Sequence, residues 1–454
     1  MNTLIRTLLA ASLLLAWSAR ADTVNLQQAI AMSVTADPRL KEGEQVIAAA
    51  QALVREVRGN AGWRINANAF IGLAPQAEGG FYQGGAFSCA VPPCTPRTDG
   101  DRLRGVSDWT RLEFALVKPL YTFGKIERYG DAAQSNVEIK QGELKKTRAD
   151  IIFDTKRAYY GHLAARDARV FLTEIQGRVD QAIATVERNL RDETGESRKT
   201  DLFALQTAKG VLAKYVHQAH AIEKISLDGL RVLTGAGLRS NLTVADAHIE
   251  PVPFPQIELA EFQARALQNR AEMQQIEAGL RARRALVAAR KADRMPDVYA
   301  GVIGQVNHAS RRERLDNPYL HDPFNNAGLT PVVGVRWDTV FGVANARVDQ
   351  AQAELEALNH KRAFAVAGIP FEVSEAYANA QANYESLREL AESSAAARRW
   401  MVASLADFAA GAETASKVAD AIRNFALVQT EYLRTVNDYN LNVAQLARLT
   451  GELD

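Results

Sequence analysis

The sequence predicts a mixed α+β chain that is mostly α, built as two tandem structural repeats in which short strands lead into very long helices. Three observations predict this fold. Residues 125–189 contain no proline and little glycine, and their apolar residues recur at steps of three and four. Four shorter stretches alternate apolar and polar residues with a period of two. The tripeptide Leu-Thr-Gly ends one helical stretch at residue 235 and another at residue 451.

The first 21 residues have the pattern of a secretory signal peptide. Arg6 supplies a positive start, residues 8–17 are apolar, and Ala19-Arg20-Ala21 is a small-x-small cleavage site. The apolar stretch is about ten residues long, which is too short to span a bilayer as a helix. We therefore expect residues 1–21 to be removed and the mature chain to be exported.

Charge and motifs exclude several function classes. The chain has 54 Lys and Arg against 53 Asp and Glu, and loss of Arg6 and Arg20 leaves it close to neutral. Such a balance argues against a nucleic-acid partner. The sequence has no Gly-x-Ser-x-Gly, no His-Glu-x-x-His and no phosphate loop. It therefore predicts no enzyme, no cofactor and no metal site.

The only cysteines are Cys89 and Cys94, separated by Ala-Val-Pro-Pro. Export makes a disulfide chemically permissible, and a short loop with two prolines could bring the sulfurs together. A metal pair is the rival interpretation, but no His or further Cys lies nearby to complete a ligand set. We expect a local disulfide that staples a loop.

The repeat divides the mature chain into residues 22–250 and 251–454. Matching features near the start of the two copies are separated by more residues than matching features near their ends. This difference indicates an insertion of about fourteen residues in the first copy, in a loop, because loops tolerate insertions. Each copy holds a helix, a strand hairpin and a long helical hairpin. The expected bounds are a hairpin at 63–120 with outer loop 75–106 and helices over 125–235, then a hairpin at 296–339 with outer loop 308–330 and helices over 343–451.

The helical stretches are longer than an ordinary globular domain. Sixty-odd residues give a helix on the order of 95 Å, which needs coiled-coil partners along its length. In the second copy, Pro370 follows Gly368 within the helical pattern. A proline inside a helix removes a hydrogen bond, so we expect a kink or break there.

The four alternating stretches suggest strands that meet a membrane. They cover residues 63–71, 109–120, 296–307 and 333–338, and apart from Lys118 their charged residues fall on one face of each stretch. A half-buried strand of a soluble sandwich remains open for any one of them. Four strands cannot close a membrane barrel, and an open edge cannot face lipid. The chain should therefore oligomerise, and three copies would give a twelve-stranded β-barrel.

The chain resembles the TolC-like outer-membrane efflux family over essentially its whole mature length. The resemblance rests on the helix start Ala36-Asp37-Pro38, the junction Lys118-Pro119-Leu120-Tyr121-Thr122-Phe123-Gly124, and the paired Leu-Thr-Gly ends. It implies a homotrimer whose twelve-stranded β-barrel lies in outer-membrane lipid and continues into an α-helical coiled-coil barrel in the periplasm. Such a trimer works with an adaptor and an inner-membrane pump and uses no cofactor. The second junction, residues 337–342, lacks the family's usual proline.

The resemblance also implies a periplasmic gate at the two helical turns. The matching positions are Thr200, Asp201, Phe408, Glu413, Lys417 and Asp420. A Lys ring beside an Asp ring largely cancels an acidic field, so we expect a weaker cation preference. We also expect mixed pairs of Lys417 with Asp201 or Asp420. The competing interpretation is that these are solvated charges worth little each.

These features favour an exit duct of a tripartite efflux system, a passive channel for small molecules such as drugs or metabolites. One alternative is the outer-membrane component of a type I protein secretion system. The other is a soluble periplasmic coiled-coil scaffold that forms no pore.

Overall fold

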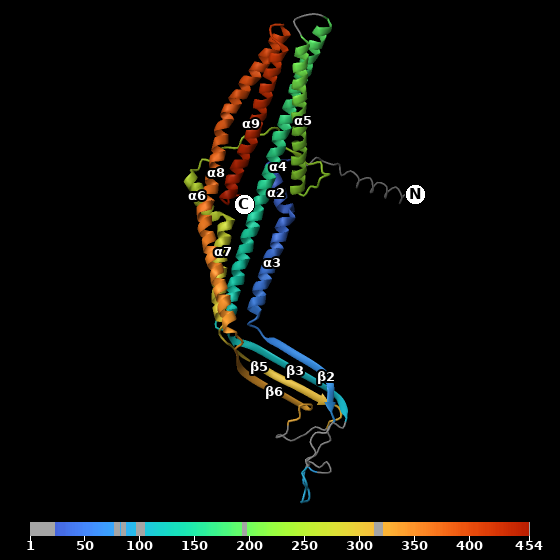
Figure 1. The fold of residues 1–454 in the computed structure, drawn as a ribbon, viewed down its shortest axis with the longest axis vertical. Helices are drawn as coiled ribbons and strands as arrows, with labels where there is room; N and C mark the ends of the chain where they lie inside the picture. The colour runs from blue at the N-terminus through green and yellow to red at the C-terminus, as the bar shows by residue number, and fades with distance from the viewer. Residues whose placement is uncertain are drawn as a thin grey trace, which may run out of the picture. The chain divides into compact units, whose positions relative to one another are not determined.

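The computed structural model describes residues 23–76, 82, 88–96, 105–192, 198–312 and 321–453. The expected signal peptide lies outside the described residues. The chain is mostly helical (Figure 1). Its elements are β1 (Thr23–Val24), α2 (Leu26–Ala36), α3 (Pro38–Gly59), β2 (Arg64–Pro75), β3 (Val106–Tyr121), α4 (Lys125–Arg191), α5 (Lys199–Leu233), β4 (Thr243–Val244), α6 (Leu259–Asn269), α7 (Ala271–Ala292), β5 (Asp297–Ala309), β6 (Asn326–Arg336), α8 (Phe341–Ala409) and α9 (Ala415–Leu449).

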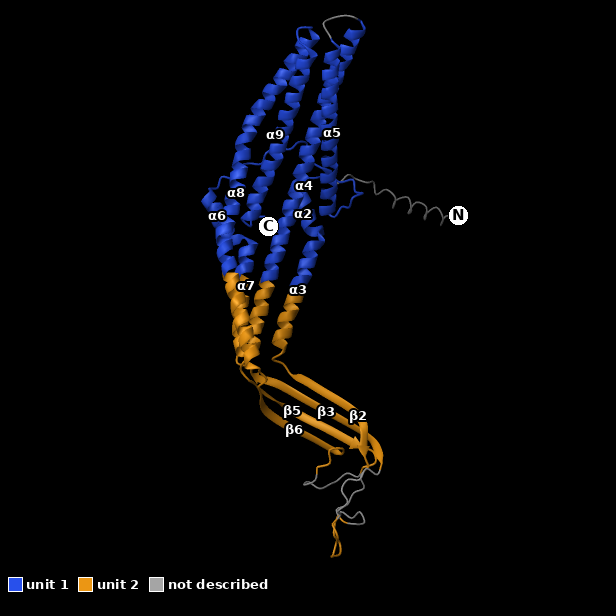
Figure 2. Ribbon diagram, in the orientation of Figure 1, with its two compact units in different colours: residues 1–47, 139–277, 360–454 blue, residues 48–138, 278–359 orange. Residues whose placement is uncertain are grey.

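The chain forms two compact units, coloured separately in Figure 2. Unit 1 comprises residues 1–47, 139–277 and 360–454, and unit 2 comprises residues 48–138 and 278–359. Each unit therefore draws segments from both halves of the sequence.

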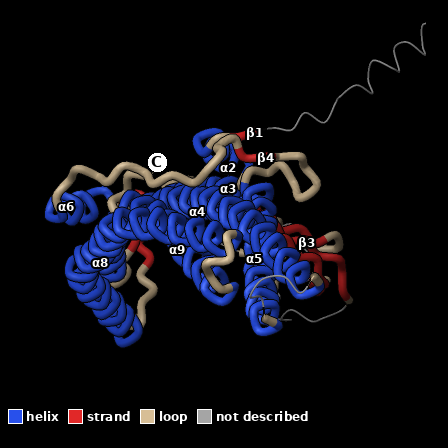
Figure 3. Tube along the Cα trace, turned by 90° about the horizontal axis from the view of Figure 1, so that it is seen from above, coloured by secondary structure: helices blue, strands red, loops and turns tan. Residues whose placement is uncertain are grey.

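Unit 1 is held together by side chains from the two long helical hairpins. Figure 3 views the chain from above and shows α4, α5, α8 and α9 as neighbouring tubes. One apolar cluster joins all four helices and contains Leu172, Ile175, Val179, Leu212, Met401, Val418, Ile422 and Phe425. A second cluster adds the short strands β1 and β4, which pair in parallel, to Tyr159, Leu163, Leu230, Val436 and Tyr439 of the helices. The helices thus find the packing partners that their length requires.

Local chemistry explains why the helices of unit 1 start and end where they do. Asn25 caps α2, because its side chain accepts the backbone N–H of Gln28 at 2.8 Å while the Gln28 side chain accepts the N–H of Asn25. Both Leu-Thr-Gly ends are built alike: Thr234 and Thr450 each donate a hydroxyl to a carbonyl four residues earlier. The following glycines have φ of +70° and +71°, the left-handed conformation that ends a helix.

Unit 2 contains a four-stranded antiparallel sheet in the order β2-β3-β5-β6. All four alternating stretches of the sequence form strands in it. The fourth strand begins at Asn326, well before residue 333, and ends at Arg336. Gly328 and Pro331 are residues that most strands exclude, so the sequence did not indicate a strand in the first half of β6. Because β6 is an edge strand, the missing N–H of Pro331 leaves the pairing with Val302 of β5 intact.

The helix does not break at Pro370, because α8 runs without interruption from Phe341 to Ala409, and the expected kink stays a prediction. The ring removes one hydrogen bond out of a 69-residue helix. The carbonyl of Pro370 accepts hydrogen bonds from the hydroxyl of Ser374, at 2.9 Å, and from the side chain of Gln263. Packing in unit 1 therefore outweighs the local helix-breaking effect.

Among the described residues, no helix is both long enough and apolar enough to span a membrane.

Candidate functional sites at the helical turns and the sheet

The turn between α8 and α9 is organised by Glu413. Gly411 takes φ +76°, which allows the chain to reverse within five residues. The carboxylate of Glu413 accepts the backbone N–H of Thr414 at 2.9 Å and lies 3.1 Å from Nζ of Lys417. These two contacts, the backbone one first, lower the pKa of Glu413 below its usual value. The turn thus carries its own charge pair, with Glu413 before α9 and Lys417 four residues later in the first turn of that helix.

The predicted pairing of Lys417 with Asp201 or Asp420 is not formed within the described part of the chain. Lys417 pairs with Glu413 and remains 68% exposed. Asp420 pairs instead with Arg423, at 2.8 Å on the same helix. Both pairs are local, three or four residues apart, because a helix presents such neighbours without any ordering of a distant segment.

The α4–α5 turn includes residues 193–197, which lie outside the described residues. Beyond it, Thr200 is exposed in the first turn of α5. The carboxylate of Asp201 accepts the backbone N–H of Arg198 at 2.9 Å, which satisfies a donor at the start of the helix. The negative charge of Asp201 is also favourable at a helix N-terminus. Asp201 therefore stabilises the start of α5 whether or not this turn forms a gate.

Phe408 is half-buried near the end of α8 and connects the two hairpins. It packs against a small apolar cluster formed by residues of α4, α5 and α9, which are Ala182, Val186, Leu205, Ala415 and Ala419. This cluster is smaller than the one further along the helices. Hydrophobic stabilisation scales with buried apolar area, so this cluster should stabilise the contact between the hairpins less than the larger one does.

The sheet of unit 2 has one polar and one apolar face. Residues directly opposite each other on paired strands share a face, and the register places most apolar residues of the four strands on one side, which also carries Lys118, while Phe70 and Ile303 lie on the other. That side carries Ile65, Ile71, Leu73, Leu112, Val306, Leu329, Val333 and Val335, all exposed and up to 87% so for Ile71. The other side carries Arg64, Asn66, Asn68, Arg111, Glu113, Asp297, Gln305, Asn307 and Arg336. Four separate alternations therefore combine into one amphipathic surface.

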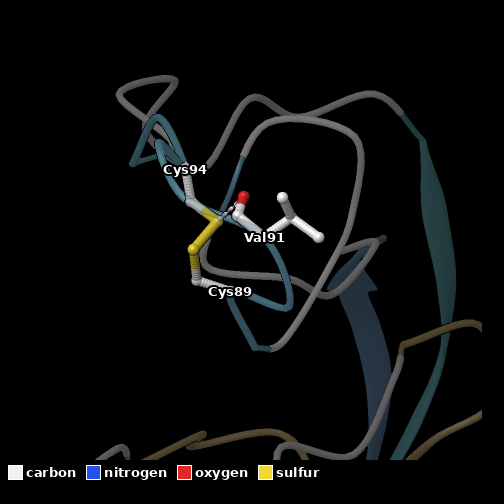
Figure 4. The surroundings of a disulfide bond; sticks show 3 residues. All are labelled: Cys89, Val91 and Cys94. Atoms are coloured by element: carbon white, nitrogen blue, oxygen red, sulfur yellow. Dashed lines mark hydrogen bonds between the residues drawn. A yellow bond between two sulfur atoms is a disulfide. The ribbon is translucent and has the colours of Figure 1, made fainter.

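Cys89 and Cys94 form a disulfide in the segment between β2 and β3 (Figure 4). Their Cα atoms lie 5.7 Å apart, within the normal range for a bridge. Sγ of Cys94 also lies 3.4 Å from the carbonyl oxygen of Val91, as Figure 4 shows. The bridge closes a loop of six residues and leaves no free thiol in the chain.

Comparison with known proteins agrees with this architecture. Residues 263–452 match the family model described as outer membrane efflux protein. The predicted family resemblance is confirmed. No curated protein sequence matches the chain.

Solved structures extend the likeness from the second half to the whole chain. The outer-membrane channel OprN is 17% identical, with a TM-score of 0.76 over 94% of this chain and 90% of that one. The CmeC outer membrane channel of Campylobacter jejuni is 13% identical, with a TM-score of 0.77 over 96% and 90%. The open state of the MtrE outer membrane channel of Neisseria gonorrhoeae is 16% identical, with a TM-score of 0.72 over 96% and 93%. At these identities the likeness is one of fold.

Proposed function

We propose that this protein is the trimeric exit duct of a tripartite efflux system in the outer membrane. The observation that carries the proposal is the sheet of unit 2, with a continuous, exposed apolar face opposite a polar face. In water, exposed apolar side chains packed this densely would favour aggregation. Against lipid they are stable, and the polar face can then line a water-filled pore.

The sheet edges require more than one copy of the chain. β2 and β6 are the outer strands of the sheet, so each has one row of backbone groups without a strand partner among the described residues. Unpaired backbone groups cost several kcal/mol each in hydrocarbon. Pairing of β6 with β2 of a neighbouring copy covers both edges, except that Pro331 has no N–H to donate, and three copies give twelve strands.

Two observations support the tripartite arrangement, which are the family likeness and the helical bundle of unit 1. Outer membrane efflux proteins release cargo that an inner-membrane pump delivers through an adaptor, and the turns of the helices are the part of unit 1 that would receive it. Because the apolar cluster around Phe408 is smaller than the one further along the helices, opening at these turns should cost less than opening there. Drugs or metabolites are the proposed cargo. Transport would be passive, because the family catalyses no reaction.

Three measurements test this function. We expect it to require detergent for extraction, to migrate as a heat-modifiable trimer, and to conduct ions in a planar bilayer. A monomer that leaves the membrane fraction without detergent would instead support the scaffold. Cargo is then tested in a host without its own duct: restored resistance to small toxic compounds supports efflux, and secretion of a co-expressed protein substrate supports the type I system.

The gate assignment has a separate test in Lys417. Lys417→Asp replaces an exposed positive charge next to Glu413 and Asp420. If three copies of this turn line the tunnel entrance, each channel changes by six charge units, which should raise cation over anion permeability severalfold. Arg434→Asp is the matched control, since Arg434 is a similarly exposed α9 residue further from the turn. Equal permeability ratios in wild type and Lys417→Asp would contradict the gate position.

A further inference from the structure

A cavity of about 480 Å³ opens on the polar face of the sheet, next to the first turns of α4. We call it the junction cavity. Its sheet wall includes Arg64, Ala115, Val117, Tyr299 and Arg336, which the strand register places on the polar face. Its helical wall includes Lys125 and Tyr129 of α4. The cavity therefore lies on the side of the sheet that would face the pore.

Positive charge exceeds negative charge in the junction cavity. Arg64, Lys125 and Arg336 line it, and Asp297 is the one carboxylate among its lining residues. Asp297 is shared: one oxygen lies 2.9 Å from Nζ of Lys125, and the other lies 3.8 Å from the guanidinium of Arg336. One carboxylate cannot neutralise three cations, so an excess of two positive charges remains.

Arg64 is the cation best placed to receive a ligand. Within the described ranges it makes no ion pair, in contrast to Lys125 and Arg336. An incoming anion can therefore contact its guanidinium without breaking an existing pair, and it can do so with two parallel hydrogen bonds. Arg111 stands on the same face of the sheet but is already paired with Glu113 and does not line the cavity.

Apolar surface surrounds these charges. Ala115, Val117, Pro119 and Ile303 form the sheet wall between Arg64 and Asp297, and the ring of Tyr299 belongs to the same wall. Tyr299 lies over Gly334, where an added Cβ would sit 2.7 Å from the Tyr299 hydroxyl. Any larger residue at Gly334 would push the ring toward the cavity, so this glycine preserves the space. The cavity thus offers an apolar wall beside an unpaired guanidinium.

We propose that the junction cavity binds the anionic end of amphipathic molecules, a carboxylate or sulfonate carried on an apolar or aromatic body. The apolar wall accommodates the body of the ligand, and Arg64 contacts its anionic group. The positive charges of Lys125 and Arg336 also attract that anionic group. As a statement about cargo, this rests on the proposed function, because a site on the polar face selects cargo only where that face lines a pore. As a binding site it stands on the cavity alone.

The test is calorimetric titration of 2-naphthalenesulfonate into the full-length purified protein in a non-ionic detergent, with detergent blanks subtracted. The neutral analogue 2-naphthol measures the contribution of the apolar body alone. We expect the sulfonate to bind at least fivefold more tightly than the naphthol, about the value of one partly exposed ion pair. Binding should weaken further as salt rises, because the contact is electrostatic.

Arg64→Gln should lower the sulfonate affinity about fivefold, while its effect on naphthol stays within twofold. Arg111→Gln is the matched control and should leave the sulfonate affinity unchanged. Arg64 makes no ion pair in the described ranges, so both proteins should fold, which circular dichroism checks. Equal affinities of wild type and Arg64→Gln, or of sulfonate and naphthol, would overturn the proposal.

Planar-bilayer conductance separates this inference from the proposed function. A protein that conducts ions but shows no Arg64-dependent binding remains a duct without an anion site. A protein that binds the sulfonate through Arg64 but conducts no ions has the site and is not a duct.

Discussion

Replacement of Leu329 by arginine tests which face of the sheet meets lipid. Leu329 is 67% exposed on the apolar face. Its row across the sheet runs through Gly304, Phe114 and Ala67, near the middle of β3 and β5. An arginine facing lipid near the bilayer midplane costs about 2–4 kcal/mol. A value of about 3 kcal/mol lowers the folded-to-unfolded ratio roughly hundredfold for each chain.

Thr330→Arg is the matched control, because the next residue in the strand points to the opposite face. On the polar face an arginine stays hydrated, so its cost should be below about 1 kcal/mol. Both variants would be folded from urea into phosphatidylcholine vesicles, and the folded fraction read from the heat-modifiable band across the urea series. Equal losses in the two variants, or a larger loss for Thr330→Arg, would refute the assignment of faces.

Three further substitutions test the helical unit. Ile422→Ala removes a fully buried side chain at the contact of the two hairpins. The free energy of unfolding should fall by about 3 kcal/mol, and the thermal midpoint followed by circular dichroism should fall with it. An unchanged midpoint would contradict this packing. Tyr159→Phe removes a 2.7 Å hydrogen bond to Asp246 and should lower the free energy of unfolding in urea by about 1.5 kcal/mol. An unchanged value would show that this hydrogen bond makes no net contribution to stability. Glu413 has a pKa below its usual value, so its stabilisation of the turn is present above about pH 4.5 and is lost as the pH falls through the lowered pKa. The protection factor of the Thr414 amide, which is its intrinsic exchange rate divided by the observed rate at the same pH, should therefore fall in acid in wild type, whereas Glu413→Gln should remove that dependence.

Periodicity was sufficient to predict the main elements. The helix predicted over 125–189 runs to Arg191, and the helices expected over 343–451 are Phe341–Ala409 and Ala415–Leu449. Long helices repeat one pattern many times, so single exceptions do not obscure it. The error at β6 has the opposite origin. Pro331 and the nearby glycine are unfavourable in most strands, and only the edge position, which is a property of the sheet, makes them acceptable.

The charges at the turns could be predicted only in part. The pair of Lys417 and Glu413 has the four-residue spacing that a helix brings together, so the local partner was available from the sequence. Asp201 keeps its helix-capping contact whether or not a gate exists. The junction cavity was not predictable, because Arg64 and Asp297 are more than two hundred residues apart in sequence and meet one cavity only through the register of three strands. Alternation gives the face of each residue, whereas register gives its neighbours.

The most direct test of the central claim is a spin-label scan along β2 in lipid vesicles. Single labels at residues 64–73 would be measured for collision with oxygen, which concentrates in lipid, and with a water-soluble nickel chelate. The apolar face predicts high oxygen accessibility at Ile65, Ile71 and the other odd positions, and the polar face predicts high nickel accessibility at Arg64 and the other even positions. Two period-two curves in opposite phase would support a sheet between lipid and a water-filled pore. Two curves in phase, both following exposure to water, would contradict it.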